Sequence, residues 1–432
     1  MDSARYTLGC GDRFGRQGEA QLAAFIAADK LGIKICPVWN KSRREHLTVH
    51  TEPAAVRAEA DAATAALGWE KSYFVDADHI SLNNVDGFID SSDFFTLDVA
   101  DFIGKPAAAE DVGEFVAAMA LFVGENKLPG IDEPLHVSGS EIRAIAEKYL
   151  FAVQEAGRIY RHIKAGKAGP FEIEVSMDET DDPQTPVEML FILAMVAREG
   201  IPVDTIAPKF SGRFNKGVDY VGDVALFEKE FELDVAALRF AGEKFGLKES
   251  LRLSVHSGSD KFSIYPAMNR VLKKFGAGLH VKTAGTTWLE EVIGLAESGG
   301  DGLLVVKKIY ATALGRFDEL ATPYATVIDI DPVALPSIEI VNGWSGEQYA
   351  NALRHDLKCP EYNSSFRQLI HVAYKVAFEL GEEYFQALEK HSGRVGQNVT
   401  HNLLQRHIVP IFGYLKPRMD ANKRQYKTEL FA

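Results

Sequence analysis

The sequence has little that would suit a secreted, disulfide-bonded or membrane-spanning protein. Its three cysteines, Cys10, Cys36 and Cys359, are odd in number and far apart, so we expect neither a disulfide framework nor a zinc knuckle. A run of about 18 apolar residues, which a membrane-spanning helix needs, is absent. The first residues also lack the apolar core of a signal peptide. We therefore expect a cytoplasmic protein.

Positive charge is scarce as well. The chain has 47 Lys and Arg against 61 Asp and Glu, which gives a formal net charge of -14. This balance argues against nucleic acid or an anionic membrane as a partner, because both bind clustered cations. A dinucleotide fingerprint is also missing, since the glycine cluster GCGDRFGRQG does not have the spacing G-x-G-x-x-G. A small anionic substrate stays compatible, because it needs only a few local cations.

Short β-type runs alternate with alanine-rich amphipathic segments along most of the chain. Eight such runs are present, at residues 6–11, 33–39, 73–76, 94–98, 171–176, 203–209, 251–256 and 278–283. Alternating strands and helices indicate parallel strands joined by crossovers, an α/β architecture. Eight repeats favour a closed (β/α)8 barrel of the TIM type over an open doubly wound sheet.

Two segments exceed a minimal barrel. Residues from about 105 to 170 form a helix-rich insertion between the fourth and fifth strands, and residues 309–432 form a helix-rich C-terminal extension. We predict a barrel domain over residues 1–308 with this extension packed on it. Within the extension, residues 372–391 are the clearest helix, and YATVIDIDP (324–332) has the pattern of an extra strand.

Polar side chains gather at the carboxyl ends of the predicted strands. In FEIEVS, the apolar Phe171, Ile173 and Val175 should face the helices, which turns Glu172, Glu174 and Ser176 inward. The same reasoning for the other strands gives Asn40, Asp76, Asp98, Lys209, Ser254, His256, His280 and Lys282, with Asp78 and His79 directly after Asp76. Any one of them could be a core residue or half of an ion pair. Their convergence on the end that holds the active sites of this fold favours a catalytic site.

The residue types in this set indicate a divalent cation and an anionic substrate. His79, His256 and His280 together with carboxylates would suit Zn²⁺ or Mn²⁺. Lys209 and Lys282 could hold a substrate carboxylate or phosphate, or one of them could form a Schiff base. Further anion-binding candidates are the loop SGSDK (Ser257 to Lys261), with its exposed backbone N–H groups, and three arginines, Arg13, Arg43 and Arg44.

Five longer segments resemble the tagaturonate epimerase family. They are GDRFGRQGEAQL, PVWNKSRREH, YFVDADHISLNNVDGF, FFTLDVADFIGK and KFSIYPAMNRVLKKFGAGLHVKTAGTTWLEE. The resemblance extends from Gly11 to about Gly300 and weakly beyond. It implies an isomerase that interconverts D-tagaturonate and D-fructuronate with the help of a divalent cation. Relatives that act on fructose and tagatose leave a neutral ketohexose open, and the chain is short for the family.

The chemistry of that reaction suggests roles for the inward residues. The inverted carbon lies β to the ketone, so its C–H bond is not acidified, and we expect retro-aldol cleavage, rotation and re-addition rather than transient oxidation by a nicotinamide. This route needs proton transfer and a Lewis acid. The predicted metal ligands are His79, His256 and His280, and the predicted catalytic residues are Asp76, Asp78, Glu174, Lys209 and Lys282. The predicted substrate-binding residues are Asp12, Arg13, Asn40, Lys41, Ser257, Asp260 and Lys261.

Two other readings stay open at this point. A metal-free aldolase could use Lys209 as its Schiff-base residue. A non-catalytic protein could bind a sugar acid, although such a pocket has little need for so many titratable groups. Association of identical chains and phosphorylation of the substrate are also left open.

Overall fold

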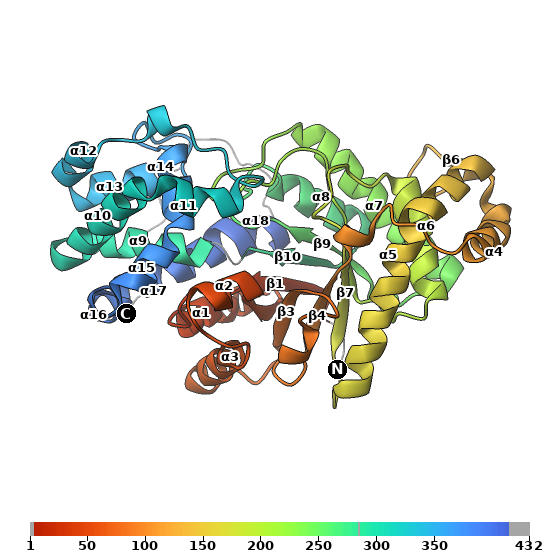
Figure 1. Ribbon diagram of the computed structural model, residues 1–432, viewed down its shortest axis with the longest axis horizontal. Coiled ribbons are helices and arrows are strands. Elements are labelled where there is room, and N and C mark those ends of the chain that lie inside the picture. The colour runs from red at the N-terminus through yellow and green to blue at the C-terminus, as the bar shows by residue number, and fades with distance from the viewer. Residues whose placement is uncertain (1–3, 284–285, 414–432) are drawn as a thin grey trace.

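The computed structural model describes residues 4–283 and 286–413, and its centre is a closed barrel of parallel strands in the order β1-β10-β9-β8-β7-β4-β3-β2 (Figure 1). The strands are β1 (Tyr6–Cys10), β2 (Cys36–Asn40), β3 (Phe74–Ile80), β4 (Phe94–Asp98), β7 (Glu172–Ser176), β8 (Thr205–Ala207), β9 (Arg252–His256) and β10 (Leu279–Lys282). Each of the eight predicted runs overlaps one of them. The prediction of a TIM-type barrel is therefore confirmed.

Helices follow the strands and cover the outside of the barrel. They are α1 (Gly18–Lys30), α2 (Arg43–Thr48), α3 (Ala54–Leu67), α5 (Gly139–Gly166), α6 (Pro186–Arg198), α7 (Val224–Phe245), α8 (Tyr265–Phe275) and α9 (Thr286–Ser298). The start of α6 shows how the sequence sets these boundaries. Thr185 accepts a hydrogen bond from the backbone N–H of Glu188, the Glu188 side chain accepts from the backbone N–H of Thr185, and Pro186 occupies the first turn. This capping box satisfies N–H groups that the helix itself leaves unpaired.

The predicted insertion lies at one end of the longest axis of the molecule (Figure 1). It contains α4 (Ala109–Met119) and a short antiparallel hairpin of β5 (Gly124–Asn126) and β6 (Leu135–Val137), and it ends in the long helix α5. The hairpin was not predicted, because three-residue strands are too short for an alternating pattern to stand out.

The C-terminal helices lie at the opposite end of the axis (Figure 1). They are α10 (Gly300–Gly315), α11 (Phe317–Ala321), α12 (Ile338–Gly343), α13 (Gly346–Leu353), α14 (Ser364–Val372), α15 (Tyr374–Leu380), α16 (Glu382–Lys390), α17 (Ser392–His401) and α18 (Val409–Phe412). Both α13 and α17 pack on the barrel helix α9. The predicted boundary between residues 308 and 309 falls inside α10. The division into domains stays a prediction, and residues 414–432 lie outside the described residues.

Two details of the predicted extension are wrong. The segment 372–391 is not one helix, because it breaks at Ala373 and at Gly381, where φ is +57°. The segment 324–332 is not a strand. Its backbone pairs with side chains of α14 instead: Gln368 exchanges two hydrogen bonds with Asp329, and Ser365 accepts one from the N–H of Asp331. No helix among the described residues is long and apolar enough to cross a membrane.

Candidate active site

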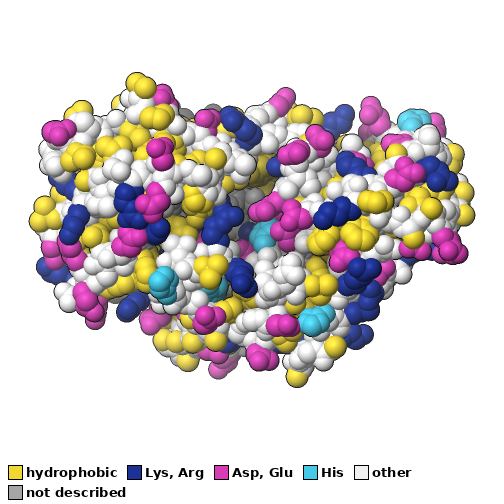
Figure 2. Space-filling model, viewed as in Figure 1, with side chains coloured by type: hydrophobic (Ala, Val, Ile, Leu, Met, Phe, Trp, Pro, Cys, Tyr) yellow, Lys and Arg dark blue, Asp and Glu magenta, His cyan; other side chains and the backbone are white. Residues whose placement is uncertain are grey.

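The barrel register brings a ring of polar side chains to the carboxyl ends of neighbouring strands. Glu174 on β7 lies opposite Thr96 on β4 and Thr205 on β8, and Lys282 on β10 lies opposite His256 on β9. In the space-filling view, a hollow opens near the middle of the face shown, with acidic, basic and His side chains along its margin (Figure 2). The sequence prediction that inward residues meet at this end therefore agrees with the geometry.

Lys282 is the centre of this cluster. Its Nζ lies 2.8 Å from Oδ2 of Asp76, 2.9 Å from Oδ1 of Asp78 and 3.2 Å from Oε1 of Glu174. It also donates to Oγ1 of Thr96 at 2.5 Å. Burial alone would lower the pKa of the ammonium group, but the carboxylates of Asp76, Asp78 and Glu174 raise it well above its usual value. Lys282 is therefore a fixed cation and not a free amine.

Glu174 and His256 extend the cluster along the rim. Oε1 of Glu174 lies 2.8 Å from Nε2 of His256, and Thr205 donates to Oε2 at 2.8 Å. On the other side of the ring, Nδ1 of His256 lies 3.1 Å from Oδ1 of Asp178. Burial disfavours the charged imidazole, yet the carboxylates of Asp178 and Glu174 raise the pKa of His256 to about 9. The two carboxylates thus hold a positive charge between them.

His79 faces the same group from the end of β3. Its ring centroid is 5.1 Å from that of His256, its Nδ1 is 3.4 Å from Oδ2 of Asp98, and its Nε2 is 3.9 Å from Oδ1 of Asp78. Its φ of +52° is uncommon for a residue with a side chain. Burial opposes the charged ring, but Asp78 and the hydrogen bond with Asp98 raise the pKa of His79 to about 10.

The carboxyl groups around Lys282 differ in their proton affinity. Burial raises the pKa of Asp76 to about 6, against the opposing effect of Lys282. Burial acts in the same direction on Asp78 and Glu174, but there the neighbouring cations prevail. The pKa of Asp78 falls to about 2, mainly because of Lys282 and His79, and that of Glu174 falls well below its usual value because of Lys282 and His256. Of these three, Asp76 is the carboxyl group that can exchange a proton near neutral pH.

One group of side chains at the rim has the geometry of a metal site. One ligand atom from each of His79, Asp178 and His256 lies within 4.8 Å of the others, and His79 forms a second group with Asp98 and Glu179. Two imidazoles and a carboxylate suit Zn²⁺ or Mn²⁺. Asp178 was missed in the sequence, because the inward alternation was not extended beyond Ser176. The signal was present, since Asp178 is two residues past Ser176, as Ser176 is past Glu174.

His280 lies outside this group. It is placed on β10 opposite Ser254, two residues before Lys282, and thus below the rim. Its Nδ1 is 2.7 Å from Oγ1 of Thr7. Burial lowers the pKa of His280 to about 3, so the ring is neutral. The structure therefore brings His79 and His256 together, but not His280 with them.

The remaining predicted residues fall into three settings. Lys209 follows β8 and is half-buried, and its backbone N–H donates to Gln184. Asp12 accepts four backbone N–H groups before α1, from Phe14, Gly15, Arg16 and Gln17. Asn40 and Lys41 are buried at the end of β2, with Oδ1 of Asn40 unpaired. Both carboxylate oxygens of Asp12 therefore accept hydrogen bonds from the backbone that follows it.

The SGSDK loop is tied to the C-terminal helices. Oγ of Ser257 donates to the carbonyl of Lys282 at 2.7 Å. Asp260 accepts from Nη2 of Arg367 at 2.7 Å, and Nζ of Lys261 donates to the carbonyl oxygens of two residues of the loop after β8, Asn215 and Val218. Both Asp260 and Lys261 have no exposed surface. Their contacts connect loops to helices, whereas the prediction had assigned them to substrate.

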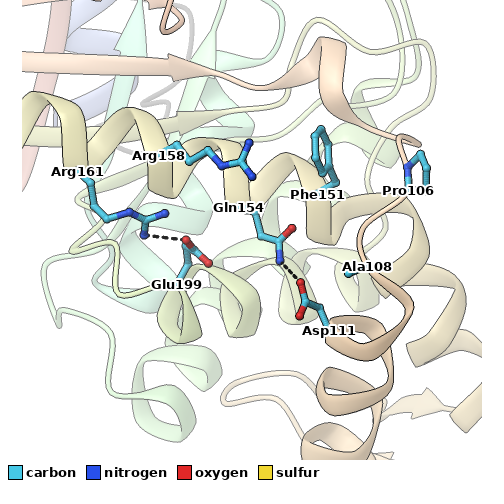
Figure 3. A pocket seen from close by; sticks show the side chains of 8 residues that line it. All are labelled: Pro106, Ala108, Asp111, Phe151, Gln154, Arg158, Arg161 and Glu199. Atoms are coloured by element: carbon cyan, nitrogen blue, oxygen red, sulfur yellow. Dashed lines mark hydrogen bonds and ion pairs between the residues drawn. The ribbon is translucent and has the colours of Figure 1, made fainter.

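Two hollows lie away from the carboxyl ends of the barrel strands. One of about 340 Å³ lies on the flank beside α5, where Arg161 pairs with Glu199 at 2.8 Å and Gln154 donates to Asp111 at 2.8 Å (Figure 3). The other, of about 480 Å³, opens near the amino ends of β9 and β10. Neither contains the titratable cluster described above, so volume alone does not locate the candidate site.

Comparison with known proteins gives a consistent result. A model of the tagaturonate epimerase family matches residues 1–408. The chain is 27% identical over 419 residues to a tagaturonate/fructuronate epimerase of Thermotoga maritima, covering 94% of this chain and 80% of that protein. Its fold is similar to crystal structures of a fructuronate-tagaturonate epimerase from Cohnella laeviribosi. A glycerol complex gives a TM-score of 0.77 at 23% identity, covering 95% of this chain and 82% of that one. The native form gives 0.75 at 24% identity, covering 96% and 82%.

Proposed function

The chain belongs to the tagaturonate epimerase family, and from this premise we propose that it interconverts D-tagaturonate and D-fructuronate at the carboxyl ends of its barrel strands. The observation that supports the location is the cluster around Lys282. Three carboxylates from two strands meet one buried ammonium group there, next to two histidines. Titratable groups with strongly shifted pKa values concentrate at catalytic sites.

The reaction that we propose is a retro-aldol cleavage followed by aldol addition. The hydroxyl group on the inverted carbon loses its proton, the bond between this carbon and its neighbour next to the ketone breaks, and the bonding electrons form an enediolate. The other product is an aldehyde, which rotates and is attacked on its opposite face. Proton and electrons return to the same carbon skeleton, so no external oxidant or reductant is consumed.

The residues around Lys282 suit the proton transfers of this route. Asp76, with a pKa of about 6, can accept the hydroxyl proton and return it. Glu174 and Asp78 stay ionised and hold the Lys282 ammonium group in place. The ammonium group would in turn stabilise the oxyanions that develop on the substrate, since preorganised charge acts strongly in a buried site.

A divalent cation fits the neighbouring group, and we propose His79, His256 and Asp178 as its ligands. The carboxylates that raise the pKa of both histidines create a negative potential that would also attract a cation. Binding would require each imidazole to lose its proton, which makes metal affinity dependent on pH. When bound, the cation supplies Lewis acidity that stabilises the enediolate.

The function is tested by incubating metal-loaded and chelator-treated protein with D-fructuronate and with D-fructose, and resolving the products by chromatography. We expect D-tagaturonate from the metal-loaded protein only, with dihydroxyacetone as the small leaked product of cleavage. Conversion of D-fructose alone would contradict the proposed substrate. Borohydride trapping of substrate on Lys209, with activity that resists the chelator, would favour the Schiff-base route instead.

The ligand set is tested by comparing two histidines of the same barrel. His256→Ala should lose bound Zn²⁺ or Mn²⁺ as measured by elemental analysis of the purified protein, because it removes one proposed ligand. His280→Gln should retain the metal, since His280 contacts Thr7 below the rim. Loss of metal in both variants would instead restore the ligand set predicted from the sequence, and retention of metal in His256→Ala would contradict both ligand sets.

A further inference from the structure

His371 is a buried polar side chain without a partner. It lies on α14, is 1% exposed, and neither Nδ1 nor Nε2 has a hydrogen-bond partner among the described residues. A buried polar group that is left unpaired loses its hydrogen bonds to water without replacing them, so native proteins rarely keep one without a ligand or an ordered water. Two unpaired nitrogens on one ring therefore indicate a binding position.

Lys216 lies on a loop that runs past His371, and burial together with the charge of Lys216 lowers the pKa of that imidazole. A side chain on the next residue, Gly217, would place its Cβ 3.4 Å from Cβ of His371, so the loop that carries Lys216 runs directly against α14. The backbone N–H of Lys216 donates to the carbonyl of Val327 at 2.7 Å, which fixes the loop to the C-terminal segment. Its own ammonium group forms no hydrogen bond or ion pair within residues 4–283 and 286–413.

The charge around Lys216 connects it to the active site. Burial and the nearby Arg13 and Arg44 lower its pKa to about 8, while Asp78 and Glu179 act in the opposite direction. Asp78 is a partner of Lys282, and Glu179 belongs to a candidate metal group. The Lys216 ammonium group is therefore within electrostatic reach of the rim, and its backbone is fixed to the C-terminal segment.

Arg13 is a second cation near His371 and Lys216, and burial together with its charge lowers the pKa of both groups. Its guanidinium group pairs with Glu45 and lies 4.7 Å from the ring centre of Tyr374, one turn beyond His371 along the chain. Its Nε is buried and unpaired. Tyr374 in turn lies 3.0 Å, oxygen to oxygen, from Tyr324. The aromatic ring and the ion pair hold Arg13 in place, so little conformational entropy is lost when it binds an anion.

We propose that Lys216, His371 and Arg13 bind the carboxylate of the substrate, and that the C-terminal helices in this way select a sugar acid over a neutral ketose. The inference rests on the proposed function, because it names the subsite for one end of that substrate. A carboxylate has two oxygens and needs several donors. The ammonium group, one imidazole N–H and Nε of Arg13 supply them. Arg13 pairs with Glu45 through Nη1, which leaves its Nε for the substrate. Two other nearby cations have their donors engaged, Arg367 by Asp260 and Lys261 by backbone carbonyls.

The test uses binding of an unreactive pair of ligands to the metal-loaded protein. D-gluconate carries the carboxylate but no ketone, and D-glucitol is its uncharged counterpart. Calorimetry should show that Lys216→Met and His371→Gln each weaken D-gluconate binding at least about tenfold, and leave the affinity for D-glucitol unchanged. Lys216→Arg should recover part of the loss. The control Lys229→Met removes an exposed lysine of α7 and should bind both ligands as the parent protein does.

Activity measurements separate failure of the subsite from failure of the function. If the parent protein epimerises D-fructuronate and Lys216→Met does so with unchanged KM, the proposed subsite is wrong and the function stands. If D-gluconate binding depends on Lys216 and His371 but no uronate is converted, the subsite stands and the function is wrong. Equal losses for D-gluconate and D-glucitol in both variants would show a structural role and overturn the inference. Circular dichroism of each variant establishes that it is folded.

Discussion

Two carboxylates on one strand of the barrel, Glu172 and Glu174, have opposite surroundings. Glu172 lies at the amino end of β7 and pairs with Arg252 on β9, Nη2 to Oε2, at 2.5 Å. Glu174 lies two residues further, at the carboxyl end, and shares Lys282 with Asp76 and Asp78 while it also contacts His256. Both side chains point into the barrel and both are buried.

Glu172 and Glu174 differ in the charged groups that surround them. At the amino end the carboxylate of Glu172 is paired with the guanidinium group of Arg252, a salt bridge between two oppositely charged side chains. At the carboxyl end several carboxylates compete for one ammonium group and two imidazoles, and one of them, Asp76, has a pKa of about 6. Breaking a buried ion pair destabilises a fold. A cluster in which several carboxylates share few cations can instead exchange protons and attract a metal cation. Burial of charge alone does not distinguish the two cases.

The largest effect is expected at the carboxyl end. Glu174→Gln keeps the shape of the side chain but removes the charge that holds Lys282 and His256. We expect turnover of D-fructuronate to fall by about 10²–10³-fold, the loss that follows removal of one preorganised electrostatic contact. The free energy of unfolding should change little, because Lys282 keeps Asp76 and Asp78. Progress curves followed by chromatography measure the first quantity, and urea unfolding the second. Unchanged turnover would remove Glu174 from the site.

The matched substitution at the amino end should act on stability instead. Glu172→Gln removes the negative charge that lies against the guanidinium group of Arg252, a side chain with no exposed surface. Breaking a buried pair in this way costs about 3–5 kcal/mol of unfolding free energy. Turnover per folded molecule should stay near that of the parent protein. A large loss of turnover at unchanged stability would show that the two ends of β7 are not separated in function.

The same comparison shows what the sequence could predict. Alternation on β7 correctly turned both glutamates inward, because the helix-facing positions are apolar, and the eight repeats predicted the barrel. Which glutamate belongs to the candidate site was not decided by alternation. The position of each glutamate along the barrel axis decides this question. That position depends on the register between strands from distant parts of the chain. His280 shows the limit of predictions from alternation. It lies on the same face of β10 as Lys282 but below the rim.

The C-terminal half was harder to predict for a different physical reason. The contacts of Asp260 with Arg367, and of Gln368 with Asp329, join segments that are about a hundred or about forty residues apart. Side-chain contacts of this kind have no period in the sequence. Lys216 and His371 were therefore not candidates, although each is a titratable residue. An unpaired ring nitrogen becomes visible only once the surrounding structure is known.

The smallest expected effect is on the pH dependence of turnover. It depends on which carboxyl group titrates at the carboxyl ends of the strands. Asp76 must be ionised to accept a proton, so kcat should fall as the pH drops through about 6. Thr96 donates to Oδ1 of Asp76 at 3.0 Å, and this hydrogen bond favours the ionised form. Thr96→Val should therefore raise the pKa of Asp76 and move the acid limb of the pH–rate profile upward, by about half to one pH unit.

The matched control for this shift is Thr205→Val. It removes the donor to Oε2 of Glu174, whose pKa is already held well below the usual range. The acid limb should then stay where it is, because Glu174 remains ionised on both sides of it. A limb that moves equally in both variants, or in neither, would mean that Asp76 is not the group responsible. The distinction matters because a proton that resides on Asp76 is next to Lys282, and in the proposed reaction it would reach the substrate oxygen that this ammonium group stabilises.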